Sequence, residues 1–253
     1  MFKPSSAACP WGAIRWAAWT GACLAIALGN YLVVSAARAD AVDVELVLAA
    51  DASGSIDEGE FALQRMGYAQ ALRDPRVINA IRGGAEQAIA VTYFEWTGPG
   101  QHVTIVPWTI VKDAASAERV ARQLLGTPRM LYGGGTGVGE AILHAIPLFD
   151  NNGFESERQV IDVSGDGPTN RGRSSGVARD LAVARGITIN GLPILTDYPG
   201  LDTYFEQNVI GGPGAFMVPA TGFDDLAQSV LHKLIREVAG ALPPRDVAGI
   251  DRR

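Results

Sequence analysis

Apolar and polar positions follow two different periods along this chain. Continuous apolar runs rich in Val, Ile and Leu indicate buried strands, and they lie at 44–51, 87–96, 158–165, 187–195 and 215–219. Apolar residues at every third or fourth position indicate helices, and this pattern covers 57–73, 113–125, 138–149, 174–185 and 223–239. Strands that alternate with helices predict a doubly wound α/β domain, in which a mostly parallel sheet lies between two layers of helices.

One connection departs from this parallel pattern. The segment 97–101, Thr-Gly-Pro-Gly-Gln, is a turn between the strand that ends at Trp96 and a further strand at 102–108. Two strands joined by so short a turn pair antiparallel. Pro107 suits an edge strand because proline has no N–H to donate to a neighbour. The sheet is therefore expected to have one antiparallel edge strand.

The two ends differ in composition from the central part, 40–240. Residues 1–39 contain three basic residues and no acid, a mostly apolar stretch, and a small-x-small motif that ends at Ala39. These features are typical of a secretory signal peptide, so we expect cleavage after Ala39 and a periplasmic or secreted protein. An uncleaved membrane anchor is the alternative, although the apolar stretch is short for a full span. Residues 241–253 are polar and proline-containing, which predicts a disordered tail.

Composition and charge exclude several classes of protein. The chain is 47% apolar and 19% charged, as globular proteins are, and its formal net charge of -6 without a basic patch argues against nucleic-acid binding. Both cysteines, Cys9 and Cys23, lie in the predicted signal peptide, so the mature chain would have no disulfide and no thiolate-bound metal. No nucleophile elbow or His-Glu-x-x-His motif occurs, and an enzyme is not expected.

Candidate chemistry begins where the first strand ends, in Asp51-x-Ser53-x-Ser55. Turns at the carboxyl ends of parallel strands are where open α/β sheets place their ligands. One carboxylate with two neutral hydroxyls is a set of hard oxygen ligands that suits Mg²⁺ or Mn²⁺. Asp and Ser are also the usual residues at helix N-termini, so this turn alone could simply cap the helix that follows.

Two later loops offer further oxygen ligands. Thr136 lies in Gly-Gly-Gly-Thr-Gly just before a predicted helix, and Asp166 lies in Ser-Gly-Asp-Gly at the end of the strand 158–165. Either motif by itself is more often a plain turn than a ligand site. Taken with the first turn, they place five oxygen-bearing side chains on three loops of one sheet, which favours a shared site.

In order and separation, Asp51, Ser53, Ser55, Thr136 and Asp166 resemble the metal-ion-dependent adhesion site (MIDAS) of von Willebrand factor A (vWA) and integrin I domains. The order of elements agrees over nearly the whole mature chain, and the protein resembles small exported bacterial vWA proteins without an assigned function. The resemblance implies a six-stranded sheet with one antiparallel edge strand. It also implies that the three hydroxyls contact Mg²⁺, with Mn²⁺ or Ca²⁺ as alternatives, while the two carboxylates act largely through bound water.

Three neighbouring residues qualify this resemblance. Gly165 stands where many vWA domains have Thr or Ser. Asp162 lies four residues before Asp166 inside the strand, and we expect it to be a hydrogen-bonded structural residue because a buried Asp needs a partner. Glu95 lies near the end of the second strand and is expected to be an exposed turn residue.

The resemblance implies a monomeric protein-binding module whose metal keeps one coordination position for an acidic residue of a protein partner. A hydrolase that uses the same metal, or a vWA scaffold with a metal-free site, are the alternatives. In I domains the site is coupled to a shift of the last helix. Here that helix is 223–239, and Leu226, Val230 and Leu234 lie on an apolar face that could slide along the sheet.

Overall fold

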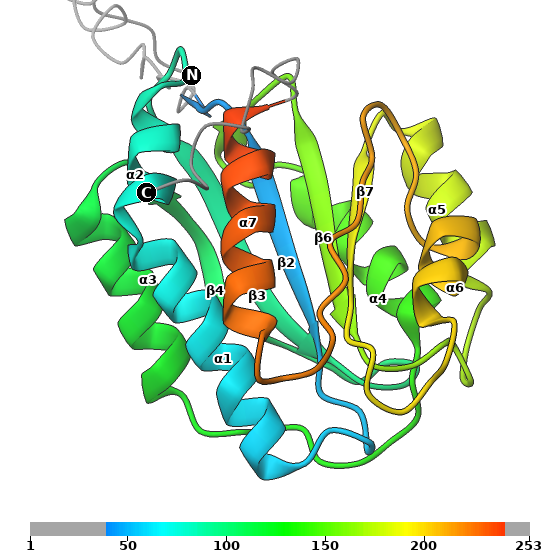
Figure 1. Cartoon of the computed structure of the whole chain (residues 1–253). Coiled ribbons are helices and arrows are strands. Elements are labelled where there is room, and N and C mark those ends of the chain that lie inside the picture. Colours follow the sequence, from blue (N-terminus) through cyan, green and yellow to red (C-terminus); the bar gives the residue numbers. More distant parts are fainter. Residues whose placement is uncertain (1–38, 241–253) are drawn as a thin grey trace, which may run out of the picture. The chain divides into compact units, whose positions relative to one another are not determined.

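The apolar runs form a central sheet of five strands in the order β4-β3-β2-β6-β7 (Figure 1). This computed structural model describes residues 39–240. The strands are β2 (Glu45–Asp51), β3 (Ile89–Trp96), β4 (His102–Val111), β6 (Gln159–Gly165) and β7 (Thr188–Pro193). Every residue of β2 and β3 is buried, which explains why their sequences show no alternation. Only β4 runs antiparallel, and it lies at the edge as predicted.

Helices cover both faces of the sheet, so the predicted three-layer α/β class is confirmed. One layer consists of α1 (Glu58–Arg73), α2 (Pro75–Arg82), α3 (Ala114–Gly126) and α7 (Leu226–Ala239). The other consists of α4 (Val138–Ala145), the short η1 (Ile146–Phe149), α5 (Ser175–Ala184) and α6 (Leu201–Asn208). Most of these helices are amphipathic and bury one stripe, whereas α1, which packs between α3 and α7, buries half of its residues.

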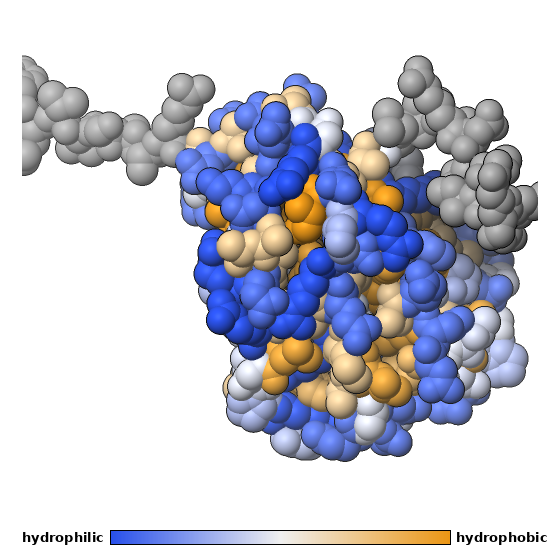
Figure 2. Space-filling view, turned by 60° about the vertical axis from the view of Figure 1, so that its left-hand side comes forward, coloured by the Kyte–Doolittle hydropathy of each residue, from blue (hydrophilic) through white to orange (hydrophobic). Residues whose placement is uncertain are grey.

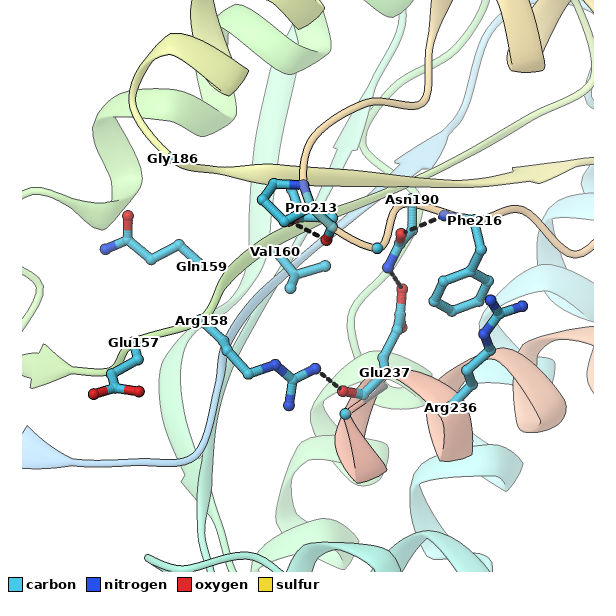
Figure 3. Close-up of a pocket in the computed structure, with 13 residues that line it drawn as sticks. Glu157, Arg158, Gln159, Val160, Gly186, Asn190, Pro213, Phe216, Arg236 and Glu237 are labelled. Atoms are coloured by element: carbon cyan, nitrogen blue, oxygen red, sulfur yellow. Dashed lines mark hydrogen bonds between the residues drawn. The ribbon is translucent and has the colours of Figure 1, made fainter. Parts of the chain in front are cut away.

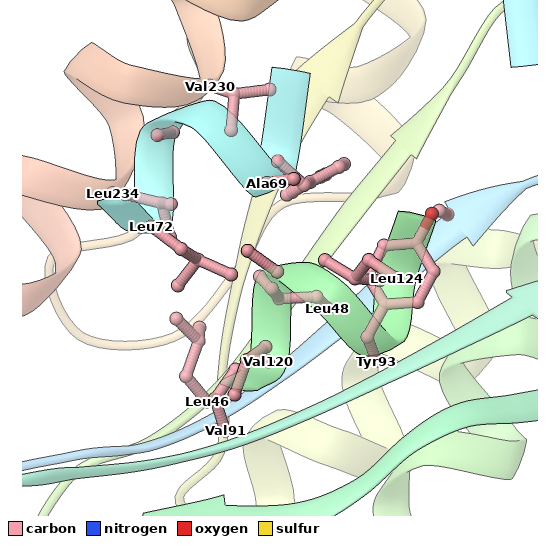
Figure 4. Packing of buried hydrophobic residues seen from close by; sticks show 14 of the residues in the cluster. Leu46, Leu48, Ala69, Leu72, Val91, Tyr93, Val120, Leu124, Val230 and Leu234 are labelled. Atoms are coloured by element: carbon pink, nitrogen blue, oxygen red, sulfur yellow. The ribbon is translucent and has the colours of Figure 1, made fainter. Parts of the chain in front are cut away.

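The larger core lies under the first of these layers (Figure 4). Leu46 and Leu48 of β2 belong to it, and Leu72 of α1, Val120 of α3 and Leu234 of α7 lie in the same cluster, all at most 1% exposed. Full burial of a side chain of this size contributes about 1.5–3 kcal/mol. The outer surface of the same helices mixes charged residues with scattered apolar ones (Figure 2).

The sixth strand implied by the vWA resemblance is not formed as a ladder within the described residues. The segment 215–219 makes only isolated bridges, such as Gly191 with Met217. Pro219 has no N–H to donate, and the segment pairs with β7 only through separate backbone hydrogen bonds, such as that from the N–H of Val218 to the carbonyl oxygen of Gly191 at 3.0 Å. A small parallel pair, β1 (Asp40–Ala41) with β5 (Phe154–Glu155), lies apart from the main sheet.

The predictions for the two ends concern residues that the structure does not describe. Residues 1–38 of the predicted signal peptide and all of the predicted tail, 241–253, lie outside the described part. Between residues 39 and 240, none of the helices has the length and apolar character that crossing a membrane requires.

Candidate metal site

The five predicted oxygen side chains meet at the carboxyl end of the sheet, because β2 and β6 are adjacent parallel strands that end side by side. Ser53 Oγ and Ser55 Oγ share a hydrogen bond of 3.3 Å, and Ser55 Oγ donates to Asp166 Oδ1 at 2.9 Å. Thr136 Oγ1 donates to Ser53 Oγ at 3.4 Å. Asp51 lies at the base of the same turn, where its Oδ1 accepts the N–H of Ser53 at 2.7 Å.

The two carboxylates are more deeply buried than the sequence indicated. Side chains at a ligand crevice beside the strand ends are expected to be accessible, but Asp51 and Asp166 are 0% and 4% exposed. The reason is that β2 is the central strand, so α1 still covers its last residue, and Gln64 of α1 donates to the carbonyl oxygen of Asp51 at 2.9 Å. Ser55 is exposed, and the cluster therefore opens to solvent at this hydroxyl.

Burial makes the negative charge of this cluster costly. Burial, and secondly the charge of Asp166, raise the pKa of Asp51 to about 8, and burial also raises the pKa of Asp166. Asp51 Oδ2 is buried without a hydrogen-bond partner, and within residues 39–240 neither carboxylate forms an ion pair. A cation at this point would supply the missing charge compensation.

The kind of cation follows from the donor types. Two carboxylates and three hydroxyls form a set of hard oxygen atoms that fits Mg²⁺, Mn²⁺ or Ca²⁺. In the part of the chain that the structure describes, no three His, Cys, Asp or Glu side chains are grouped so that they could hold a metal. A metal at this site would therefore depend on the Ser and Thr hydroxyls, as it does in the MIDAS pattern.

The loop that carries Thr136 is held in place by a residue that the sequence did not reveal. Asn170 Oδ1 accepts the N–H of Thr136 at 2.9 Å, and the N–H of Asn170 donates to the carbonyl oxygen of Thr136 at 2.9 Å. The loop also passes close to the turn after β3, since a Cβ at Gly137 would lie 2.9 Å from the carbonyl oxygen of Thr97. In the sequence, the only indication that Asn170 supports the site is that it follows Asp166 by four residues.

Arg129 is a second residue that sequence reasoning missed. Its side chain is only 5% exposed, and its guanidinium donates to the carbonyl oxygens of Ile56 at 3.0 Å and Leu131 at 2.8 Å. The guanidinium also lies 4.5 Å from the ring centroid of Phe61. Arg129 thereby links the loop after β2 to the loop before Thr136. Nothing in the local sequence pattern distinguishes it from a surface arginine.

The expectation that Glu95 is an exposed turn residue is wrong. Its carboxylate is fully buried in the sheet and accepts two hydrogen bonds from Arg65 of α1, at 2.7 and 3.0 Å. Burial raises the pKa of Glu95, while Arg65 opposes this increase. Because β3 is an interior strand under α1, its last residues stay covered. Glu95 is thus a structural ion-pair partner next to the site.

Asp162 also has a structural partner, as expected. It forms a buried ion pair with Lys233 of α7, and Lys233 pairs in turn with Glu237. Glu237 additionally accepts a hydrogen bond from Asn190 of β7 at 2.9 Å. A shift of α7 along the sheet would break these contacts, so it would cost more free energy than the sliding of a purely apolar face.

An enclosed hollow lies away from the cluster. It has a volume of about 260 Å³ and opens between the start of β6, β7 and the end of α7 (Figure 3). Its polar groups largely bond to one another: Asn190 bridges Glu237 and the N–H of Phe216, and Arg158 donates to the carbonyl oxygen of Glu237. We therefore assign these groups a structural role, and the oxygen cluster is the candidate site.

Comparisons with known proteins identify the family and the fold of this chain. A family model described as "Protein of unknown function (DUF1194)" matches residues 41–242. No curated protein matches the chain. Among solved structures, the chain is similar to proximal thread matrix protein 1 from the mussel byssus, with 15% identity, 80% of this chain and 49% of that chain covered, and a TM-score of 0.58.

Two further structures share the fold. A form of the mussel protein described as having a zinc-occupied MIDAS motif matches with 14% identity, 79% and 46% coverage and a TM-score of 0.56. A von Willebrand factor type A protein from Catenulispora acidiphila matches with 18% identity, 78% and 43% coverage and a TM-score of 0.54. The chain spans half or less of the length of these proteins, and such low identity shows the fold alone. The family match over residues 41–242 shows that the chain belongs to the DUF1194 family of proteins of unknown function, and its fold is that of a vWA domain.

Proposed function

We propose that this protein is an exported, metal-dependent protein-binding module. In this proposal, Ser53, Ser55 and Thr136 hold Mg²⁺ directly, and Asp51 and Asp166 hold it largely through bound water. The observation that carries the proposal is the cluster itself: three hydroxyls converge on two buried carboxylates, one of which has an unpartnered oxygen. Mn²⁺ and Ca²⁺ suit the same oxygen atoms.

The donor set also indicates what the site would bind. When most of the directly bound protein ligands are neutral, Mg²⁺ keeps water molecules and remains electrophilic, so a carboxylate can replace one of these waters. The cluster is accessible at Ser55. A partner protein would therefore reach the metal with an acidic side chain. The zinc-occupied MIDAS of the mussel protein supports a divalent metal at this position of the fold.

The histidines do not favour hydrolysis at this site. Burial, and secondly His102, lower the pKa of His144 to about 4, and the two rings stack with centroids 3.4 Å apart. His232 is an exposed residue of α7. Within the described residues, none of the three forms a hydrogen bond with the oxygen cluster, so none is placed as a general base there.

Calorimetric titration with Mg²⁺ and Mn²⁺ tests the metal site. Thr136→Val removes one hydroxyl at almost constant volume and should weaken binding at least about tenfold, because a ligand of the ion is lost. Thr109→Val is the matched control on the far part of the edge strand, and it should bind as the wild type does. Equal affinity in wild type and Thr136→Val would refute the assignment of the site.

The partner is tested by affinity capture from an envelope extract. Wild-type protein with Mg²⁺ should retain a protein that is released by a chelator and is not retained by Thr136→Val. If the same proteins are retained by the variant, or in the presence of chelator, their binding does not involve the metal and the proposed mode of recognition is wrong.

A further inference from the structure

An open hollow of about 700 Å³ adjoins the metal site on the side of Thr136. Its walls are the turn after β3, the glycine-rich loop and the loop after Asp166, and it is lined by Gly98, Pro99, Gln101, Gly134, Gly135, Asn170 and Arg171. Two of these walls also position Thr136: Gly135 of the glycine-rich loop directly precedes it, and Asn170 of the loop after Asp166 forms a hydrogen bond with it. A ligand in the hollow would thus be a direct neighbour of a group bound to the metal.

The lining of this hollow is rich in hydrogen-bond donors and carries one positive charge. Arg171 is its only charged residue, and within residues 39–240 its guanidinium has no ion pair or hydrogen bond. The N–H groups of Gly134 and Gly135 also have no partner in this part of the chain. Gln101 Oε1 is engaged by Thr97, which leaves the amide nitrogen of Gln101 available as a donor.

The backbone holds Arg171 against the hollow. Its N–H donates to the carbonyl oxygen of Thr136 at 3.2 Å. Its side chain lies over Gly135, where an added Cβ would be only 2.2 Å from Arg171 Cγ. Any larger residue at position 135 would therefore displace this side chain. The guanidinium beyond these atoms belongs to an exposed residue, and its planar fork can pair with a carboxylate that enters the hollow.

We propose that this hollow binds a second carboxylate of the partner, so that the site recognises a protein segment with two acidic groups close together. The first carboxylate would complete the coordination shell of the metal. The second would pair with Arg171 and accept hydrogen bonds from the N–H groups of Gly134 and Gly135 beside Thr136. This inference rests on the proposed function. It adds a charge requirement to that function, since a segment with a single acid would fill only half of the site.

The test uses the Mn²⁺-loaded protein, with the protein in excess of the metal, and measures the proton relaxation of water. A carboxylate that replaces a metal-bound water lowers this relaxation. Acetate probes the metal position alone, whereas dicarboxylates from succinate to pimelate can reach both positions. For the chain length that spans them, the wild type should bind the dicarboxylate about three- to tenfold more tightly than acetate, as a charge-assisted pair at an accessible surface allows.

Two variants assign this gain to its source. Arg171→Gln should bind Mn²⁺ and acetate as the wild type does, but should lose the preference for the dicarboxylate. Arg173→Gln, with the same change of charge two residues further along the loop, should keep it. If no dicarboxylate exceeds the statistical factor of two over acetate, or if Arg171→Gln keeps the preference, the second position is disproved. If acetate itself does not displace water, the proposed function fails, and this inference fails with it.

Discussion

Replacing Asp51 by Asn should stabilise the metal-free protein while abolishing its response to Mg²⁺. The pKa of Asp51 is raised from 3.8 to about 8 by burial and by Asp166. A group whose pKa is raised in the folded state contributes its stability below its unfolded pKa, and that contribution is lost as the pH rises through the folded pKa. The metal-free wild type should therefore lose stability between about pH 4 and pH 8.

The size of this effect follows from the same shift. At pH 7 the carboxyl of Asp51 is ionised in the unfolded chain but still protonated in the folded one. At 1.36 kcal/mol for each pKa unit, this difference destabilises the metal-free folded state at pH 7 by about 4 kcal/mol, as an upper limit. Asn preserves the acceptor for the N–H of Ser53, which Asp51 Oδ1 provides at 2.7 Å. Its amide nitrogen would bury two N–H groups without a partner, whereas the protonated oxygen that it replaces buries one O–H group without a partner, so this difference offsets part of the gain. We expect a gain of about 1–4 kcal/mol at pH 7.

Urea unfolding with chelator at pH 5, 7 and 8.5 measures this difference. The curves of wild type and Asp51→Asn should diverge as the pH rises, because only the wild type has this carboxyl to ionise. Asp180→Asn, an exposed residue of α5, is the control and should follow the wild type. With saturating Mg²⁺ the wild type should gain stability and Asp51→Asn should not. A metal-free variant that is less stable than the wild type, with the same pH slope, would refute the reasoning.

Three other predictions concern the rest of the chain. Lys233→Met leaves the buried Asp162 and Glu237 without their cation. The variant should lose about 3–5 kcal/mol of its free energy of unfolding, measured with urea. A loss below about 1 kcal/mol would contradict the buried network. If α7 shifts on carboxylate binding as the last helix of I domains does, the hydrogen-exchange rates of its amides should change. Unchanged rates on demonstrated binding would indicate rigid docking. N-terminal sequencing of the native protein should begin at Asp40, and an intact Met1 would disprove export by cleavage.

The sequence alone determined most of the main elements and the positions of the candidate oxygen ligands. Unbroken apolar runs become interior strands because both faces of a parallel sheet are covered, and β2 and β3 follow this rule. Since parallel strands end at the same edge, oxygen side chains that follow β2 and β6 had to come close together. This rule identifies four of the candidate ligands: Asp51, Ser53, Ser55 and Asp166. The fifth, Thr136, was identified by its glycine-rich loop before a predicted helix.

Only the tertiary structure decided how deeply these groups lie and which charges pair. Arg65 and Glu95 form an ion pair although they are 30 residues apart in the sequence. Lys233 of α7 likewise pairs with Asp162 of β6. No local pattern specifies such ion pairs, because they depend on which helix packs over which strand. The same packing buries Asp51 and thereby raises its pKa. Sequence periodicity reports the local conformation of the backbone, whereas burial and ion pairing are properties of the assembled layers.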